Sequence, residues 1–168
     1  ATGGNIDITN AADAAVTVVL LTTLGASTVS YAQTGNQTLA LTSVSAANGD
    51  VTVSNAGGTG ADITIGAVTA DTTDDTVTIT ASGSIDDAVG ADDATADVTA
   101  AVVDLNAAEG IGTGTAVDVD ITSPDIRADS TAGAISLTSL SGAATTLTSV
   151  TTSGAAINVD HTGNGNLT

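Results

Sequence analysis

The sequence predicts an all-β fold, a parallel β-solenoid with about 20–24 residues in each coil. Three observations support this: frequent glycines, short alternating phrases behind them, and a near absence of aromatic residues. The chain has 168 residues, of which 19 are glycine and 1% are aromatic. Many glycines precede a phrase in which two apolar residues flank one polar residue, as in residues 5–8, 50–53, 62–65, 134–137 and 156–159. This alternation is typical of short strands that bury one face.

The spacing of the phrases predicts the coil. Their centres lie near residues 7, 18, 30, 40, 52, 64, 78, 98, 104, 119, 136, 148, 158 and 167. Most neighbours are about 10 to 14 residues apart, so two strands would form one coil of the predicted length. We expect parallel strands with inward-pointing apolar residues at Ile6, Val51, Ile63, Val77, Val119, Ile135 and Ile157. Thr64 and Ser136 alternate with them and should face outward.

The segments between the phrases are rich in Gly, Asn, Asp and Ser, which favour tight corners. Pro124 lacks an amide proton and fits a corner better than a paired strand. The Ala-rich segments 10–15 and 91–97 show no sustained helical period and are predicted to be loops. Residues 14–21 form the longest apolar stretch, which we predict to be a fully buried strand. A bilayer-spanning helix needs roughly 20 apolar residues, so no membrane insertion is expected.

An immunoglobulin-like sandwich is the competing all-β architecture. Its core is usually anchored by aromatic residues, and its hairpins often carry two-residue turns such as Asn-Gly. Here Tyr31 is the only aromatic residue, and Asn-Gly occurs only at 48–49 and 164–165. Small and β-branched residues suit the narrow interior of a solenoid better.

The charge of the chain limits its partners. Nineteen acidic residues stand against a single cation, Arg127, and the formal net charge is −18. This excludes nucleic acid, because phosphate contacts need clustered Lys and Arg. An exposed pair of Arg127 with Asp125, Asp129 or a corner carbonyl would contribute only about 0–1 kcal/mol. The chain has no cysteine for disulfides, so its stability must come from repetition of the coil.

Residues 1–168 are predicted to form a single solenoid segment. The chain has no methionine, and residues 163–168 stop within a repeat phrase that residues 1–6 could continue. We therefore expect the segment to belong to a longer repetitive chain or to be a filament subunit that stacks on itself head to tail.

One motif suggests a metal. Gly57, Gly58, Gly60 and Asp62 match the opening of the Gly-Gly-x-Gly-x-Asp nonapeptide that binds Ca²⁺ in parallel β-rolls. The large apolar eighth residue of the nonapeptide is replaced by Thr64, and no second copy follows in tandem. At most a weakly bound Ca²⁺ is expected here, and no other cofactor.

No catalytic constellation is found. The acidic pairs 74–75, 86–87 and 92–93 invite comparison with carbohydrate-cleaving β-helices, but adjacent residues on a strand point to opposite faces. In corners, such pairs are more simply turn formers. His161, the only histidine, stands beside Asp160 and is expected at the surface rather than as a metal ligand or base. We predict that the protein is not an enzyme.

Two segments resemble a known family. Residues 74–88 read DDTVTITASGSIDDA, and residues 100–113 read AAVVDLNAAEGIGT. They resemble the repeat of filamentous-haemagglutinin-type adhesins and related giant bacterial surface proteins, in which a TVTLTASGAI.DA phrase leads to A..L.L.A..GIGT. The resemblance implies a right-handed parallel β-helix and an exported filament outside the cell or at its surface. It carries no functional residues.

The expected function is structural. We expect a non-catalytic component of an extracellular filament or cell-surface adhesin, assembled by stacking coil on coil. The alternative is an adhesin module that binds a surface glycan or host protein through an exposed aromatic or apolar patch, for which only Tyr31 is available. A polysaccharide-cleaving β-helix is the third candidate, and its catalytic and sugar-binding residues are missing.

Overall fold

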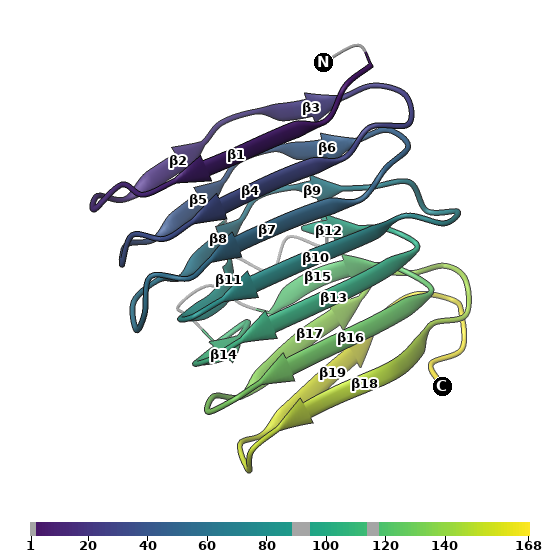
Figure 1. The fold of residues 1–168 in the computed structure, drawn as a ribbon. Coiled ribbons are helices and arrows are strands. Elements are labelled where there is room, and N and C mark those ends of the chain that lie inside the picture. Colours follow the sequence, from purple (N-terminus) through teal and green to yellow (C-terminus); the bar gives the residue numbers. More distant parts are fainter. Residues whose placement is uncertain (1–2, 89–94, 114–117) are drawn as a thin grey trace.

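A computed structural model describes residues 3–88, 95–113 and 118–168 of the chain. These residues wind into a right-handed parallel β-solenoid of about six turns (Figure 1). The predicted all-β class and parallel stacking are confirmed. The described part of the chain has no helix with the length and apolar character that a membrane crossing needs.

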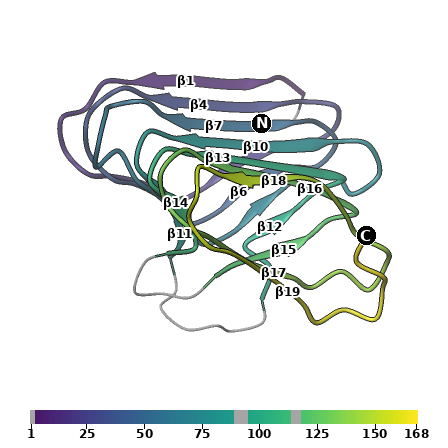
Figure 2. The same ribbon diagram turned by 90° about the horizontal axis from the view of Figure 1, so that it is seen from below.

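The first five coils each contain one long strand and two short ones. The long strands form sheet A and the short strands form sheet B, on opposite sides of the interior (Figure 2). Sheet A consists of β1 (Ile6–Asn10), β4 (Val29–Gln33), β7 (Val51–Asn55), β10 (Thr76–Ala81), β13 (Val102–Ala107), β16 (Asp125–Ser130) and β18 (Thr146–Thr152), in this order.

Sheet B has two rows of short strands that merge near the C-terminal end. One row is β2 (Val16–Val18), β5 (Leu39–Leu41), β8 (Ile63–Ile65), β11 (Ser84–Asp87) and β14 (Gly110–Ile111). The other row is β3 (Leu21–Thr23), β6 (Val44–Ala46), β9 (Val68–Thr69), β12 (Val98–Thr99) and β15 (Val119–Thr122). β17 (Ile135–Ser139) pairs with both β14 and β15, and β19 (Ile157–His161) pairs with β17. In the last two coils, one continuous strand (β17 or β19) therefore takes the place of the two short strands of sheet B.

Strand register gives the length of each coil. Ile6 pairs with Val29 and Val29 with Val51, which are steps of 23 and 22 residues. The next two steps, through Val77 to Val103, are 26 residues each and exceed the predicted range. In the second of these steps, the connection from β11 to β12 has ten residues, whereas two residues join β8 to β9. The coil is regular in pairing but tolerates insertions between strands.

Inward apolar residues stack in columns because the parallel strands pair in register. One column of sheet A is Ile6, Val29, Val51, Val77, Val103, Ile126 and Leu147. One column of sheet B is Val16, Leu39, Ile63, Ile85, Ile111, Ile135 and Ile157. The inner members of both columns are only 0–1% exposed. Each side chain lies about 4.8 Å from the next, so β-branched residues fill the narrow interior.

The inward column at the C-terminal ends of the sheet A strands begins with polar residues. It contains Asn10, Gln33, Asn55, Ala81 and Ala107. The Asn10 amide donates to the hydroxyl of buried Tyr31 at 3.0 Å, and the Asn55 amide donates to the carbonyls of Gln37 and Asp62 at 2.9 Å. The Asn10 amide thus links β1 to a side chain of β4. The Asn55 amide ties the end of sheet A to the corners beside it, because it satisfies two carbonyls of the turning backbone.

The predicted single strand at residues 14–21 is wrong. The stretch divides into β2 and β3, and Val19 and Leu20 at the bend between them are 67% and 65% exposed. The bend turns two successive side chains outward, whereas period-two alternation predicts that successive side chains point to opposite faces. The prediction of two strands per coil is wrong for the first five coils, since β3, β6, β9, β11 and β14 were not expected. β16 was missed as well, although it is a long strand, because its sequence is charged.

The predicted inward residues lie in parallel strands, as expected. Val51, Ile63, Val77 and Val119 have no exposed surface. Ile6 is only partly buried, and Ile157 is 46% exposed although it stacks on Ile135. Both belong to terminal coils of the rod, where a column has a neighbour on one side only.

The register can be tested with alanine at adjacent positions. Ile63→Ala should lower the free energy of unfolding by about 2–5 kcal/mol, because it opens a cavity in a packed column. Thr64→Ala, one residue along and facing outward, should change it by less than about 0.5 kcal/mol. Ile157→Ala should fall between them because its side chain is half-exposed. Urea unfolding of the three variants measures this, and equal losses at positions 63 and 64 would contradict the register.

Candidate functional site

The glycines of the Ca²⁺ motif lie in the corner between β7 and β8. A Cβ at Gly57 would lie 2.1 Å from the carbonyl oxygen of Gly35 in the coil above, so only glycine fits there. Gly58 and Gly60 have φ angles of 106° and 93°, which side chains rarely adopt. Close packing at Gly57 and the positive φ angles at Gly58 and Gly60 therefore account for all three glycines without a metal.

The Asp62 carboxylate points to the next coil. Its Oδ1 accepts hydrogen bonds from the backbone N–H of Ser84 at 2.8 Å and from the Ser84 hydroxyl at 3.2 Å. A Cβ at Gly83 would lie 2.2 Å from the same oxygen. Asp62 thus links two coils at their corner, and glycine at position 83 leaves room for its carboxylate.

A different acidic group brings ligand atoms closest together. Oxygens of Asp71, Asp74 and Asp75, in the corner before β10, all lie within 4.8 Å of one another. Burial, and then the charge of Asp74, raise the pKa of Asp75, whereas hydrogen bonds from Thr73 lower the pKa of Asp71. The Oδ2 atom of Asp75 is buried without a hydrogen-bond partner in the described structure. Oxygen ligands suit a hard cation such as Ca²⁺, although exposed acidic corners also occur without one.

The other two acidic pairs have different positions. Asp86 and Asp87 lie in β11, so the strand interpretation applies to this pair and the turn-former interpretation does not. Asp86 accepts hydrogen bonds from the Ser84 hydroxyl at 2.5 Å and from the backbone N–H of Thr113 at 2.9 Å. Asp92 and Asp93 lie outside the described residues.

His161 was predicted to lie at the surface, but the structure places its half-buried side chain on the inward face of β19. It is the last residue of β19 and stacks on Ser139 and Ile121 in an inward column. Its Nε2 lies 3.0 Å from the carbonyl oxygen of Gly165, and its Nδ1 is buried without a hydrogen-bond partner. The column changes from apolar Ile121 to polar Ser139, and a polar imidazole follows next to the serine.

Arg127 pairs with Asp125, one of its predicted partners. The guanidinium Nη2 lies 2.9 Å from Asp125 Oδ2 on the outer face of β16. The arginine side chain is 45% exposed, so the pair stabilises the fold by less than about 1 kcal/mol.

Two buried acids were missed. Asp97, just before β12, is 6% exposed, and Asp120 in β15 is 4% exposed. They occupy positions that alternate with the inward residues Val98 and Ile121, so the pattern placed them at the surface. Nothing in the alternation marks them as buried, because aspartate is ordinary at outward strand positions.

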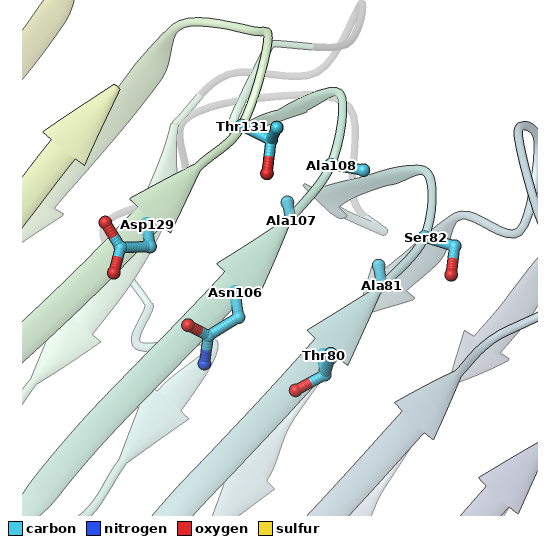
Figure 3. Close-up of a pocket in the computed structure, with 8 residues that line it drawn as sticks. All are labelled: Thr80, Ala81, Ser82, Asn106, Ala107, Ala108, Asp129 and Thr131. Atoms are coloured by element: carbon cyan, nitrogen blue, oxygen red, sulfur yellow. The ribbon is translucent and has the colours of Figure 1, made fainter. Parts of the chain in front are cut away.

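A shallow hollow of about 260 Å³ lies on the outer face of sheet A, where β10, β13 and β16 end (Figure 3). Thr80, Asn106 and Asp129 line it from neighbouring strands, together with Ala81, Ser82, Ala107, Ala108 and Thr131. Asp129 is the only carboxylate among these lining residues, whereas glycoside hydrolysis needs two. The hollow offers hydroxyl and amide groups for weak polar contacts.

No protein-family model, curated protein or solved structure matches the chain. The likeness to filamentous-haemagglutinin-type repeats is therefore a sequence resemblance only. The parallel β-solenoid that it implies is the fold of the chain.

Variants of Asp62 distinguish a coil link from a metal ligand. Asp62→Ala should destabilise the fold by about 1–3 kcal/mol, because the Ser84 N–H loses its acceptor. Asp62→Asn keeps an oxygen acceptor and should recover most of this loss. The measurement is urea unfolding with calcium chloride and with EGTA. If Ca²⁺ stabilises the native chain and Asp62→Asn abolishes that effect, Asp62 acts as a metal ligand.

Proposed function

We propose that the chain is a non-catalytic structural segment of a β-solenoid filament or long adhesin, outside a bacterial cell or at its surface. The observation that carries the proposal is the continuity of the inward columns from the first coil to the last. Such a rod gains length by adding coils, and each new coil repeats the same contacts. The resemblance of residues 74–88 and 100–113 to surface-adhesin repeats supports the location.

The terminal coils are suited to continuation. Ile6, Ile8, Val16 and Leu21 at one end, and Leu147 and Val150 at the other, are partly buried apolar residues packed against the core. All paired strands are parallel, so a coil added at either end keeps the same strand direction only if it is joined head to tail. Either more of the same polypeptide or a second copy could supply that coil.

The C-terminal residues constrain how a second copy could join. Leu147 N–H donates to the Thr168 carbonyl at 2.9 Å, just as Ile6 N–H donates to the Thr28 carbonyl at 3.0 Å in the first coil. Residues 166–168 therefore lie where a further coil begins. At a junction of two copies in this register, residues 3–5 of the second copy would need the same space. One of the two segments must move aside for stacking, whereas a continuous polypeptide has no such conflict.

Removing residues 166–168 should therefore favour end-to-end association. We expect the shortened chain to form longer and more numerous thin, unbranched fibres than the 168-residue chain does. Negative-stain electron microscopy and sedimentation velocity at matched concentrations measure this. Discrete monomers for both chains at micromolar concentration would rule out stacking of copies. An intact native mass near that of 168 residues would then rule out the continuous-chain form as well.

An adhesin module remains the second candidate, and one surface favours it. Tyr31 is 5% exposed and cannot serve as a sugar platform, but Val19, Leu20 and Leu24 are 67%, 65% and 52% exposed on the first coil. If this patch binds a host protein, the double variant Val19→Ser, Leu20→Ser should lose adhesion to host cells and keep fibre formation. Unchanged adhesion would exclude the patch as the binding surface.

A further inference from the structure

The outer face of sheet A is an ordered polar surface. Its seven long strands lie side by side and nearly parallel, and no other described element covers them (Figure 1). Because the strands pair in register, their outward side chains form columns along the rod. The first column is Asp7, Ser30, Thr52, Thr78, Asp104, Arg127 and Ser149. The second column is Thr9, Ala32, Ser54, Thr80, Asn106, Asp129 and Thr151.

Arg127 and Asp129 stand next to each other in these columns, on the same strand and roughly 7 Å apart. Nη2 of Arg127 contacts Asp125, and a guanidinium has further N–H donors for a second carboxylate. Asp129 is exposed and forms no hydrogen bond or ion pair with the described residues. It lies between two adjacent hollows of about 260 and 400 Å³, which also share Thr131 (Figure 3). A long side chain from another molecule therefore has room beside this carboxylate.

We propose that the outer face of sheet A pairs with the same face of a second copy of this chain, with both rods pointing the same way. The two-fold axis runs parallel to the rods, between the two columns. It places the first column of each copy over the second column of its partner. Arg127 then meets the partner's Asp129, and Asp129 meets the partner's Arg127. The pairing does not rest on the proposed filament role, because it uses the side of the rod and not its ends.

The remaining polar residues of the two columns agree with this axis. Asp104 faces the partner's Asn106, and Asp7 faces the partner's Thr9, so each carboxylate meets a hydrogen-bond donor. At the other levels, hydroxyl groups face hydroxyl groups, except that Ser30 faces the partner's Ala32. No acid of the two columns lies opposite an acid.

Two-fold axes along the strands fit less well. An axis through β16 sets Arg127 against the partner's Arg127 and Asp129 against the partner's Asp129. An axis between β13 and β16 overlaps only β10, β13, β16 and β18 of each copy, and it sets Val102 against the partner's Asp125. The charge pattern therefore selects rods that point the same way.

The size and charge of the face set the strength of the pairing. Seven strands about 4.8 Å apart and about 17 Å long give roughly 500 Å² on each copy, or about 1,000 Å² in total. This area suits a weak, specific dimer. Each copy carries a net charge of −18, so two copies repel each other at long range. Salt at about 0.15 M screens charges beyond about 8 Å, so the dimer should tighten as salt rises from about 0.01 M to that value.

Charge reversals in the full 168-residue chain test the interface. Sedimentation velocity at about 0.15 M NaCl measures the dimer dissociation constant. Arg127→Asp and Asp129→Arg each set like charges opposite one another at two places, and each should weaken the dimer at least about tenfold. Asp129→Arg reduces the net negative charge, so general repulsion alone would predict a tighter dimer. Asp13→Arg makes the same charge change at an exposed corner and should leave the dimer intact.

Two rescue experiments test the two-fold axis itself. The double variant Arg127→Asp, Asp129→Arg exchanges the two charges and should recover the wild-type dimer. An equimolar mixture of the two single variants should form heterodimers, because each charge then faces its opposite. Urea unfolding checks that every variant keeps the fold.

The outcomes separate this pairing from end-to-end stacking. A wild-type chain that stays monomeric, a double variant that does not recover, or a mixture without heterodimers overturns the proposal. Fibres that form equally well in all of these variants would also overturn it, while end-to-end stacking would stand. Discrete dimers that respond to the charges as expected, without fibres, support the pairing and count against stacking of copies.

Discussion

In-register stacking of each coil on the next is the interaction on which the whole molecule depends. A single coil cannot bury its apolar face, because its interior is only one residue deep along the axis. A neighbouring coil completes the backbone hydrogen bonds and covers the inward side chains at the same time. This is why Ile63 and Ile85 are fully buried in a chain with almost no aromatic residues. It also explains why the coil tolerates additions between strands, since only the paired residues must keep register. Within sheet A, the pairing of β16 with β18 absorbs one extra residue, Thr148, as a bulge.

Much of the fold could be predicted from the sequence, because the stacked strands carry clear period-two alternation. Prediction failed where a strand is too short or too charged to display it. β9 and β14 have two residues each, and β16 reads DIRADS directly after Pro124, so its apolar side is represented by Ile126 and Ala128 alone. The exposure of Val19 and Leu20 arises from a bend between strands, which depends on the shape of the whole coil.

The candidate sites were less predictable, for a different reason. A glycine corner and a Ca²⁺ loop share the same residues, and only the close approach of Gly57 to the Gly35 carbonyl tells them apart. One signal was present: these two glycines are 22 residues apart, which equals one coil step. No comparable signal marks Asp97 and Asp120. Aspartate is ordinary at outward strand positions, and its burial here is a tertiary effect that alternation does not encode.

The position of Arg127 affects how readily proteases can cleave the rod. Trypsin-like proteases cleave after lysine or arginine and must draw an extended segment into their active site. The chain has one such residue, and it lies within β16, paired in register with β13 on one side and β18 on the other. Chymotrypsin-like enzymes that prefer aromatic residues find only Tyr31, which is enclosed in the interior. Both cleavages require a strand to leave the middle of a sheet, so the folded rod should resist proteases of these two specificities.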